Sequence, residues 1–136
     1  AAREIPAEEK LQVYGDPDAA FTVLSWGSTK GAILEATQRL AAEGVQVRHL
    51  QIRMLWPFPA QELAPFLATA QPLVVVETNY SGQMARLLTQ ETGTKPDHLV
   101  VKYNGRPIAV NELLEAMRAI LAGKAGPRYV IRNPFE

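Results

Sequence analysis

The residues best suited to binding an anion form the short turn Gly27-Ser28-Thr29-Lys30-Gly31. If a helix begins there, its first amides could hold a phosphate. The segment is neither the eight-residue phosphate loop nor the dinucleotide fingerprint, and Ser28 does not lie in a Gly-x-Ser-x-Gly nucleophile turn. We therefore favour a tight turn in which Ser28 or Thr29 caps a helix. Binding of a phosphate or nucleotide at Ser28–Gly31 is the alternative.

Candidate acids, bases and metal ligands are few. Glu77 ends an apolar run, and we expect its carboxylate to accept hydrogen bonds from loop amides, since no histidine or second acid is close in sequence. His49 lies within a predicted strand and is interpreted as a structural histidine, while His98 is expected at the surface. The chain has no cysteine, which excludes thiolate nucleophiles and cysteine ligands to zinc or iron–sulfur clusters. We predict no catalytic, cofactor-binding or metal-binding residue in this chain.

The composition is that of a globular domain without a global electrostatic field. The 136 residues are 47% hydrophobic, enough for a core, and fit one domain. Fourteen basic residues balance fourteen acidic ones, so nucleic-acid binding is disfavoured. No apolar run is long enough for a membrane span, and no signal peptide is recognisable, so we expect no membrane partner and a cytoplasmic protein.

Strand-like and helix-like patterns alternate along the chain. Apolar runs predict strands at 21–26, 45–52, 73–76 and 98–102, and each is followed by a helical pattern, although Pro65 is expected to split or distort the second helix. This alternation predicts an α/β fold with a parallel sheet covered by helices on both faces. We divide the chain into a lead-in at 1–20 with a possible antiparallel strand, an α/β domain at 21–123, and a tail at 124–136. The tail is apolar enough that we expect it to pack on this domain or to reach a neighbour.

The loops that follow the predicted strands share an unusual content. They are Gly27–Gly31, Arg53–Pro59, Thr78–Gly82 and Tyr103–Pro107, and parallel strands would bring them to one edge of the sheet. Five of the ten aromatic residues lie in or beside them, as is typical of protein interfaces, although local capping of the core is the alternative. The predicted interface residues are Trp26, Ser28, Lys30, Trp56, Phe58, Asn79, Tyr80, Gln83 and Arg106.

Four segments resemble one known family in the same order. They are Val23–Gly31, Leu55–Pro59, Val76–Gln83 and Tyr103–Pro107. They look like core domain II, the C-terminal domain of the α subunit of 2-oxoacid:ferredoxin oxidoreductases, closest to the 2-oxoglutarate type. The resemblance implies a three-layer α/β/α sandwich like the transketolase C-terminal domain, with a mostly parallel, five-stranded mixed sheet. Its first strand, at 11–14, would run against the others.

The resemblance also implies a role. Whole enzymes of this family convert a 2-oxoacid, coenzyme A and oxidised ferredoxin to acyl-CoA, carbon dioxide and reduced ferredoxin. Their thiamine diphosphate, magnesium and iron–sulfur cluster would be held by other domains and by the β subunit, which are the implied partners in a dimer-forming complex. The chain would be an assembly domain, inactive in isolation. A small module that binds a phosphate or nucleotide such as coenzyme A at Ser28–Gly31 remains the alternative, and a stand-alone enzyme ranks last.

One position departs from the family pattern. The family often has Ser or Thr just before its last helix, three residues ahead of a Glu, whereas here Ala109 precedes Glu112. Half of a capping box is therefore missing, at a cost of about 1 kcal/mol.

Overall fold

The computed structural model describes residues 6–15, 18–53, 58–69, 72–78, 83–102 and 108–131. The strands are β1 (Leu11–Tyr14), β2 (Phe21–Trp26), β3 (Val47–Ile52), β4 (Leu73–Glu77), β5 (His98–Lys102) and β6 (Arg128–Ile131). The α-helices are α1 (Ala7–Lys10), α2 (Lys30–Ala42), α3 (Ala60–Leu67), α4 (Gln83–Thr92) and α5 (Val110–Leu121), and a 3-10 turn, η1, spans Gly27–Thr29. The predicted alternation of strand and helix is confirmed.

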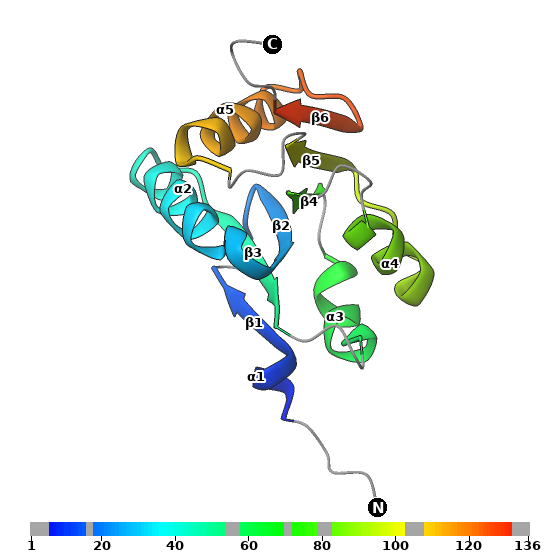
Figure 1. Ribbon diagram of the computed structural model, residues 1–136. Coiled ribbons are helices and arrows are strands. Elements are labelled where there is room, and N and C mark those ends of the chain that lie inside the picture. The colour runs from blue at the N-terminus through cyan, green and yellow to red at the C-terminus, as the bar shows by residue number, and fades with distance from the viewer. Residues whose placement is uncertain are drawn as a thin grey trace, which may run out of the picture.

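The strands form one mixed sheet with the order β1-β3-β2-β4-β5-β6 (Figure 1). β1 pairs antiparallel with β3, as the resemblance implies, and every other pairing is parallel. The sheet has six strands where the resemblance implies five, because β6 from the expected tail pairs with β5 in the register Leu99↔Arg128 to Lys102↔Ile131. The described part of the tail therefore packs on this domain.

The start of β3 and the course of α3 differ from what the sequence pattern predicts. The strand predicted from Val45 begins at Val47, because the Val45 amide closes the end of α2 by donating to the Leu40 carbonyl at 2.9 Å. Gly44 allows this closure with a φ of +87°. Helix α3 contains Pro65 and ends at Leu67. The helix continues through Pro65 although this residue has no amide to donate to the preceding turn, so the split expected there is not observed.

A buried arginine holds the end of α3 against the sheet. Arg48 of β3 is 3% exposed, and burial lowers the pKa of its guanidinium. Its Nη2 donates to the Phe66 carbonyl at 2.7 Å, and its Nε donates to Thr22 Oγ1 at 3.2 Å. The guanidinium also lies 5.6 Å from the centre of the Phe66 ring. Arg48 therefore connects the end of α3 to β2 and β3.

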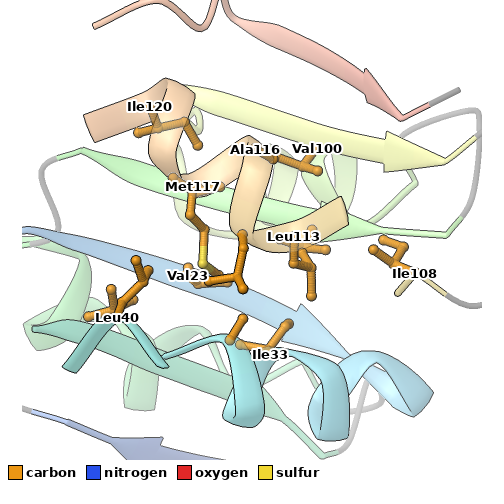
Figure 2. Packing of buried hydrophobic residues seen from close by; sticks show 14 of the residues in the cluster. Val23, Ile33, Leu40, Val100, Ile108, Leu113, Ala116, Met117 and Ile120 are labelled. Carbon is orange, nitrogen blue, oxygen red and sulfur yellow. The ribbon is translucent and has the colours of Figure 1, made fainter. Parts of the chain in front are cut away.

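Helices cover both faces of the sheet, so the core has two halves. One half packs beneath α2 and α5, where Figure 2 shows Met117 of α5 reaching toward Val23 of β2. The other half packs beneath α3 and α4 and contains Leu24 and Leu50. Neighbouring residues such as Val23 and Leu24 thus face opposite layers, as strand geometry requires. This is the three-layer α/β/α sandwich that was predicted.

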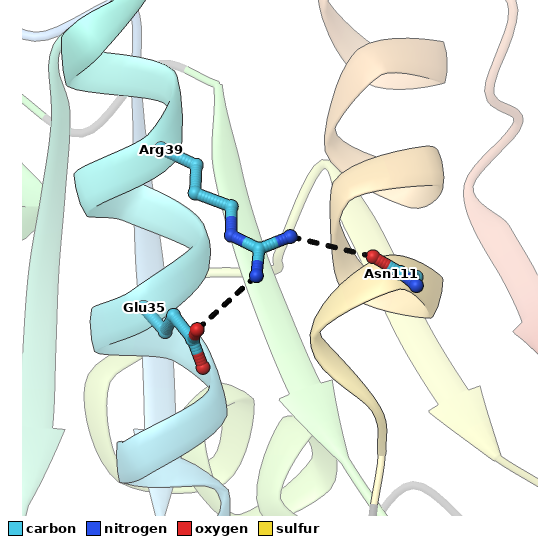
Figure 3. A network of polar contacts seen from close by, with 3 residues as sticks. All are labelled: Glu35, Arg39 and Asn111. Carbon is cyan, nitrogen blue, oxygen red and sulfur yellow. Dashed lines mark hydrogen bonds and ion pairs between the residues drawn. The ribbon is translucent and has the colours of Figure 1, made fainter.

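A polar contact also joins α2 to α5. Arg39 of α2 donates to Glu35 Oε1 at 3.2 Å and to Asn111 Oδ1 at 3.4 Å (Figure 3). Both bonds are exposed, and exposed pairs of this kind contribute at most about 1 kcal/mol. Burial of Leu40 and Met117 between the same helices contributes more, at roughly 1.5–3 kcal/mol per side chain.

Candidate functional site

The carboxyl ends of β2, β3, β4 and β5 lie at one edge of the sheet because these strands run parallel. A cavity of about 180 Å³ opens there between β2, β4 and the first turns of α4. Its lining residues are mostly apolar and are Trp26, Val76, Glu77, Thr78, Gln83, Met84 and Leu87. The cavity is the size of one large aliphatic side chain, too small for a nucleotide.

Trp26 is an exposed aromatic residue in the lining of this cavity. It is the last residue of β2, and 49% of its surface is accessible, whereas Phe21 to Ser25 of the same strand are all buried. An indole left half in water forfeits much of the roughly 1.5–3 kcal/mol that burial of a large apolar side chain supplies. Tryptophan is also the residue type most enriched at the energetic centres of interfaces. The edge therefore presents a half-exposed tryptophan beside a cavity.

Glu77 forms the polar wall of the cavity and fixes the start of α4. Its Oε1 accepts the Met84 amide at 2.5 Å, and its Oε2 accepts the Ala85 amide at 3.3 Å. The carboxylate thus satisfies two amides that the helix itself leaves unpaired. Burial raises the pKa of Glu77, and the two amide hydrogen bonds oppose that rise. The prediction that Glu77 accepts backbone amides is confirmed, but the donors lie in the first turn of α4 and not in the loop.

A buried polar network lies on the α2 side of the same edge. Ser25 Oγ is 2.7 Å from His49 Nε2 and donates to Gln51 Oε1 at 2.5 Å, while Gln51 Nε2 donates to the Gly27 carbonyl at 3.4 Å. Since the Ser25 proton is used on Gln51, His49 Nε2 must carry a proton and donate to Ser25. His49 Nδ1 is then an acceptor with no partner among the described residues.

This network cannot activate Ser25 as a nucleophile. A protonated His49 Nε2 cannot take the Ser25 proton, which a general base would have to do. Burial lowers the pKa of His49 to about 4, so the ring is neutral at pH 7. Ser25 and His49 are 0% and 1% exposed, out of reach of a substrate. The structural role predicted for His49 fits this geometry, whereas the participation of Ser25 and Gln51 was not predicted.

Of the predicted turn at Ser28–Gly31, Ser28 and Thr29 belong to the 3-10 turn η1, whereas Lys30 and Gly31 already lie in α2. Gly27 opens η1 with a φ of +77°. Thr29 occupies the position before α2 but does not cap it. Its hydroxyl donates weakly to the Trp26 carbonyl at 3.4 Å instead of accepting a helix amide. Lys30 Nζ lies 5.5 Å from the centre of the Tyr14 ring, a cation–π contact with β1.

The structure brings two of the nine predicted interface residues into one cavity, namely Trp26 and Gln83. Phe58 is partly buried against the core half beneath α3 and α4, and Lys30 lies over Tyr14. Ser28 lies in the turn, and its side chain is not described. Trp56, Asn79, Tyr80 and Arg106 lie outside the described residues. Met84 and Leu87 were not predicted as part of the site. The sequence indicated only that they belong to a helix.

Comparison with known proteins identifies the class. Residues 19–113 match the family model of the pyruvate:ferredoxin oxidoreductase core domain II. The α subunit of the 2-oxoacid:ferredoxin oxidoreductase of Saccharolobus solfataricus is 39% identical over 131 residues, which is 96% of this chain and 20% of that subunit. The α subunit of 2-oxoacid:ferredoxin oxidoreductase 2 of Aeropyrum pernix is 44% identical over 117 residues, 86% of this chain and 18% of that subunit. The chain thus spans about a fifth of the length of these curated relatives.

Two solved structures share the fold. The 2-oxoglutarate:ferredoxin oxidoreductase of Magnetococcus marinus, solved with 2-oxoglutarate, coenzyme A and succinyl-CoA bound, has a TM-score of 0.76 at 31% identity and is matched over 82% of this chain and 19% of that one. The α chain of a probable 2-oxoacid ferredoxin oxidoreductase of Thermoplasma acidophilum has a TM-score of 0.60 at 34% identity, over 84% of this chain and 98% of that one.

The α/β fold and the family match define the chain as a member of the oxidoreductase core domain II family. Its relatives are, more particularly, α subunits of 2-oxoacid:ferredoxin oxidoreductases. In the described parts of the chain, no three His, Cys, Asp or Glu residues are grouped so that they could hold a metal ion. Within those same ranges, no helix is both long and apolar enough to cross a membrane.

Proposed function

We propose that this chain is a non-catalytic assembly domain of a thiamine-diphosphate-dependent 2-oxoacid:ferredoxin oxidoreductase. The parent enzyme converts a 2-oxoacid, coenzyme A and oxidised ferredoxin to acyl-CoA, carbon dioxide and reduced ferredoxin. Membership of the core domain II family supports this assignment. The chain supplies no cysteine for an iron–sulfur cluster, so in this proposal the cluster, the thiamine diphosphate and its magnesium belong to other domains and to the β subunit. The assembly is a cytoplasmic dimer.

The half-exposed Trp26 beside its cavity is the observation that carries the assembly role. Val76, Met84 and Leu87 leave a pocket that one apolar side chain of another polypeptide can fill. Once that side chain is bound, the indole of Trp26 is also shielded from water. The filled pocket and the buried indole then form the centre of a small interface, with polar groups such as Gln83 at its rim. We propose that the undescribed Trp56, Asn79, Tyr80 and Arg106 extend the same contact.

The test is a Trp26→Ala substitution in the complete α subunit, co-expressed with the remaining subunits. Loss of an interface anchor of this kind costs about 2 kcal/mol or more, so we expect the affinity between subunits to fall roughly 30-fold or more. Size-exclusion chromatography and co-purification across a dilution series measure the change. Circular dichroism of the variant should report an unchanged fold, because Trp26 is half outside the core.

Leu121→Ala is the matched control. Leu121 is similarly exposed, at 40%, but it is the last residue of α5 and does not line the cavity. It should leave assembly intact. Equal co-purification of the Trp26 variant and the parent protein, with Trp56→Ala and Tyr80→Ala also without effect, would contradict the proposed role.

A further inference from the structure

A second, larger hollow of about 560 Å³ lies on the outer side of α4, away from Trp26. One side of α4, from Ala85 to Gln90, the turn before β5 and the first residues of β5 and β6 line it. Leu99 and Arg128, which are paired in the sheet, both stand near the amino ends of their strands. The hollow shares no lining residue with the Trp26 cavity. We call it the α4–β6 groove.

The α4–β6 groove is positively charged although the chain as a whole is neutral. Its lining contains Arg86, Lys95 and Arg128 and no acidic residue. Arg86 and Lys95 are both exposed and take part in none of the four ion pairs found among the described residues. Arg86 acts electrostatically on the buried Glu77, but both cations present their charge at the surface of the groove.

Two acidic side chains on neighbouring elements accept backbone amides. Glu77 is buried and accepts the Met84 and Ala85 amides, and Asp97 Oδ2 accepts the Leu73 amide at 2.7 Å. Glu91 of α4 lines a different hollow, on the side of α4 that faces α3. Acidic and basic residues are therefore segregated to opposite sides of this helix, and only the basic side faces the α4–β6 groove.

The floor of the groove is apolar. Ala85 is buried, and Leu99 and Pro96 are half-buried. A small anion would be poorly held here, because the cations are exposed and separately hydrated. A polypeptide that carries Asp or Glu side chains on either side of an apolar residue satisfies both features at once. We infer that the α4–β6 groove docks an acidic segment of another polypeptide chain, at a surface separate from the Trp26 cavity.

The test uses the full chain and a short fluorescein-labelled peptide in which glutamates flank a central leucine. Fluorescence anisotropy should report saturable binding at low salt that weakens as NaCl is raised. The Arg86→Glu/Lys95→Glu variant should bind about tenfold or more weakly, because two favourable charge contacts become repulsive. Replacing the central leucine of the peptide by serine should also weaken binding, which tests the apolar floor.

Arg118→Glu/Lys124→Glu is the matched control, since it changes the net charge equally at two exposed residues on and just after α5. It should bind like the parent chain. The inference would be overturned if the peptide did not bind, or if both variants lost binding equally. It would also be overturned if inorganic phosphate, added at the same total negative charge as the peptide, displaced the peptide completely. Trp26→Ala should leave peptide binding unchanged, so a failure here is distinguishable from a failure of the proposed assembly role.

Discussion

At the scale of single residues, His49 links stability to pH. Its folded-state pKa of about 4 lies below the ordinary value of 6.5 because the ring is buried. The unfolded chain therefore binds a proton at pH values where the folded chain does not. Stability from this group is complete above pH 6.5 and is lost as the pH falls toward 4.

We predict a loss of roughly 2 kcal/mol of unfolding free energy between pH 7 and pH 5, and roughly 3 kcal/mol by pH 4, from His49 alone. Urea unfolding at a series of pH values measures it. The loss above pH 5 should disappear in His49→Gln and persist in His98→Gln, which leaves the buried ring in place. An undiminished loss in His49→Gln would refute the assignment.

Sequence reasoning reached some of these residues and missed others. The role of Glu77 was predictable because a carboxylate at the end of an apolar strand faces the free amides of the next helix. The bond from Ser25 to Gln51 was not, because it depends on the register in which Ser25 of β2 stands opposite Gln51 of β3. A register of this kind is fixed by the whole sheet and has no local sequence signal.

At the scale of elements, the alternating strands and helices of the α/β domain were predictable from their periodicity, whereas the outermost strands of the sheet were less so. β6 has only four residues, and the sequence there shows no periodic pattern that would predict an element. Its pairing with β5 is what defines it as a strand. α3 continues through Pro65, so the split expected from this proline did not occur. The hydrogen bond from Arg48 to the Phe66 carbonyl was not predictable, because a buried arginine with no carboxylate partner among the described residues runs against ordinary residue preferences.

The start of α5 can be improved by one substitution. Ala109 has the extended backbone of a cap residue, with φ −78° and ψ 152°, and its amide donates to Glu112 Oε1 at 2.9 Å. Only the reciprocal bond is missing, because alanine has no side-chain acceptor. Ala109→Ser should raise the unfolding free energy by about 1 kcal/mol, measurable as a higher midpoint in urea. Ala122→Ser, at the other end of α5, should give no such gain, and equal gains would point to a cause other than capping.

At the scale of the whole molecule, β6 completes the core beneath α2 and α5. Ile131 is 6% exposed and belongs to that half of the core. Ile131→Ala should lower the unfolding free energy by about 2–4 kcal/mol, because it removes buried atoms and leaves a cavity. Val130→Ala, at a half-buried neighbour, should cost less. Chemical unfolding compares the two, and a Val130 effect as large as that of Ile131 would mean that β6 does not pack as described.

The sheet order has a mechanical consequence. β1 and β6 stand at opposite edges, five inter-strand steps apart, which at the usual spacing is about 24 Å. Tension applied between these two strands acts across the sheet and loads its inter-strand hydrogen bonds one row at a time. Under such a load an outer strand would separate from the sheet at low force. Contact between β1 or β6 and a neighbouring polypeptide would therefore raise the force that the domain withstands.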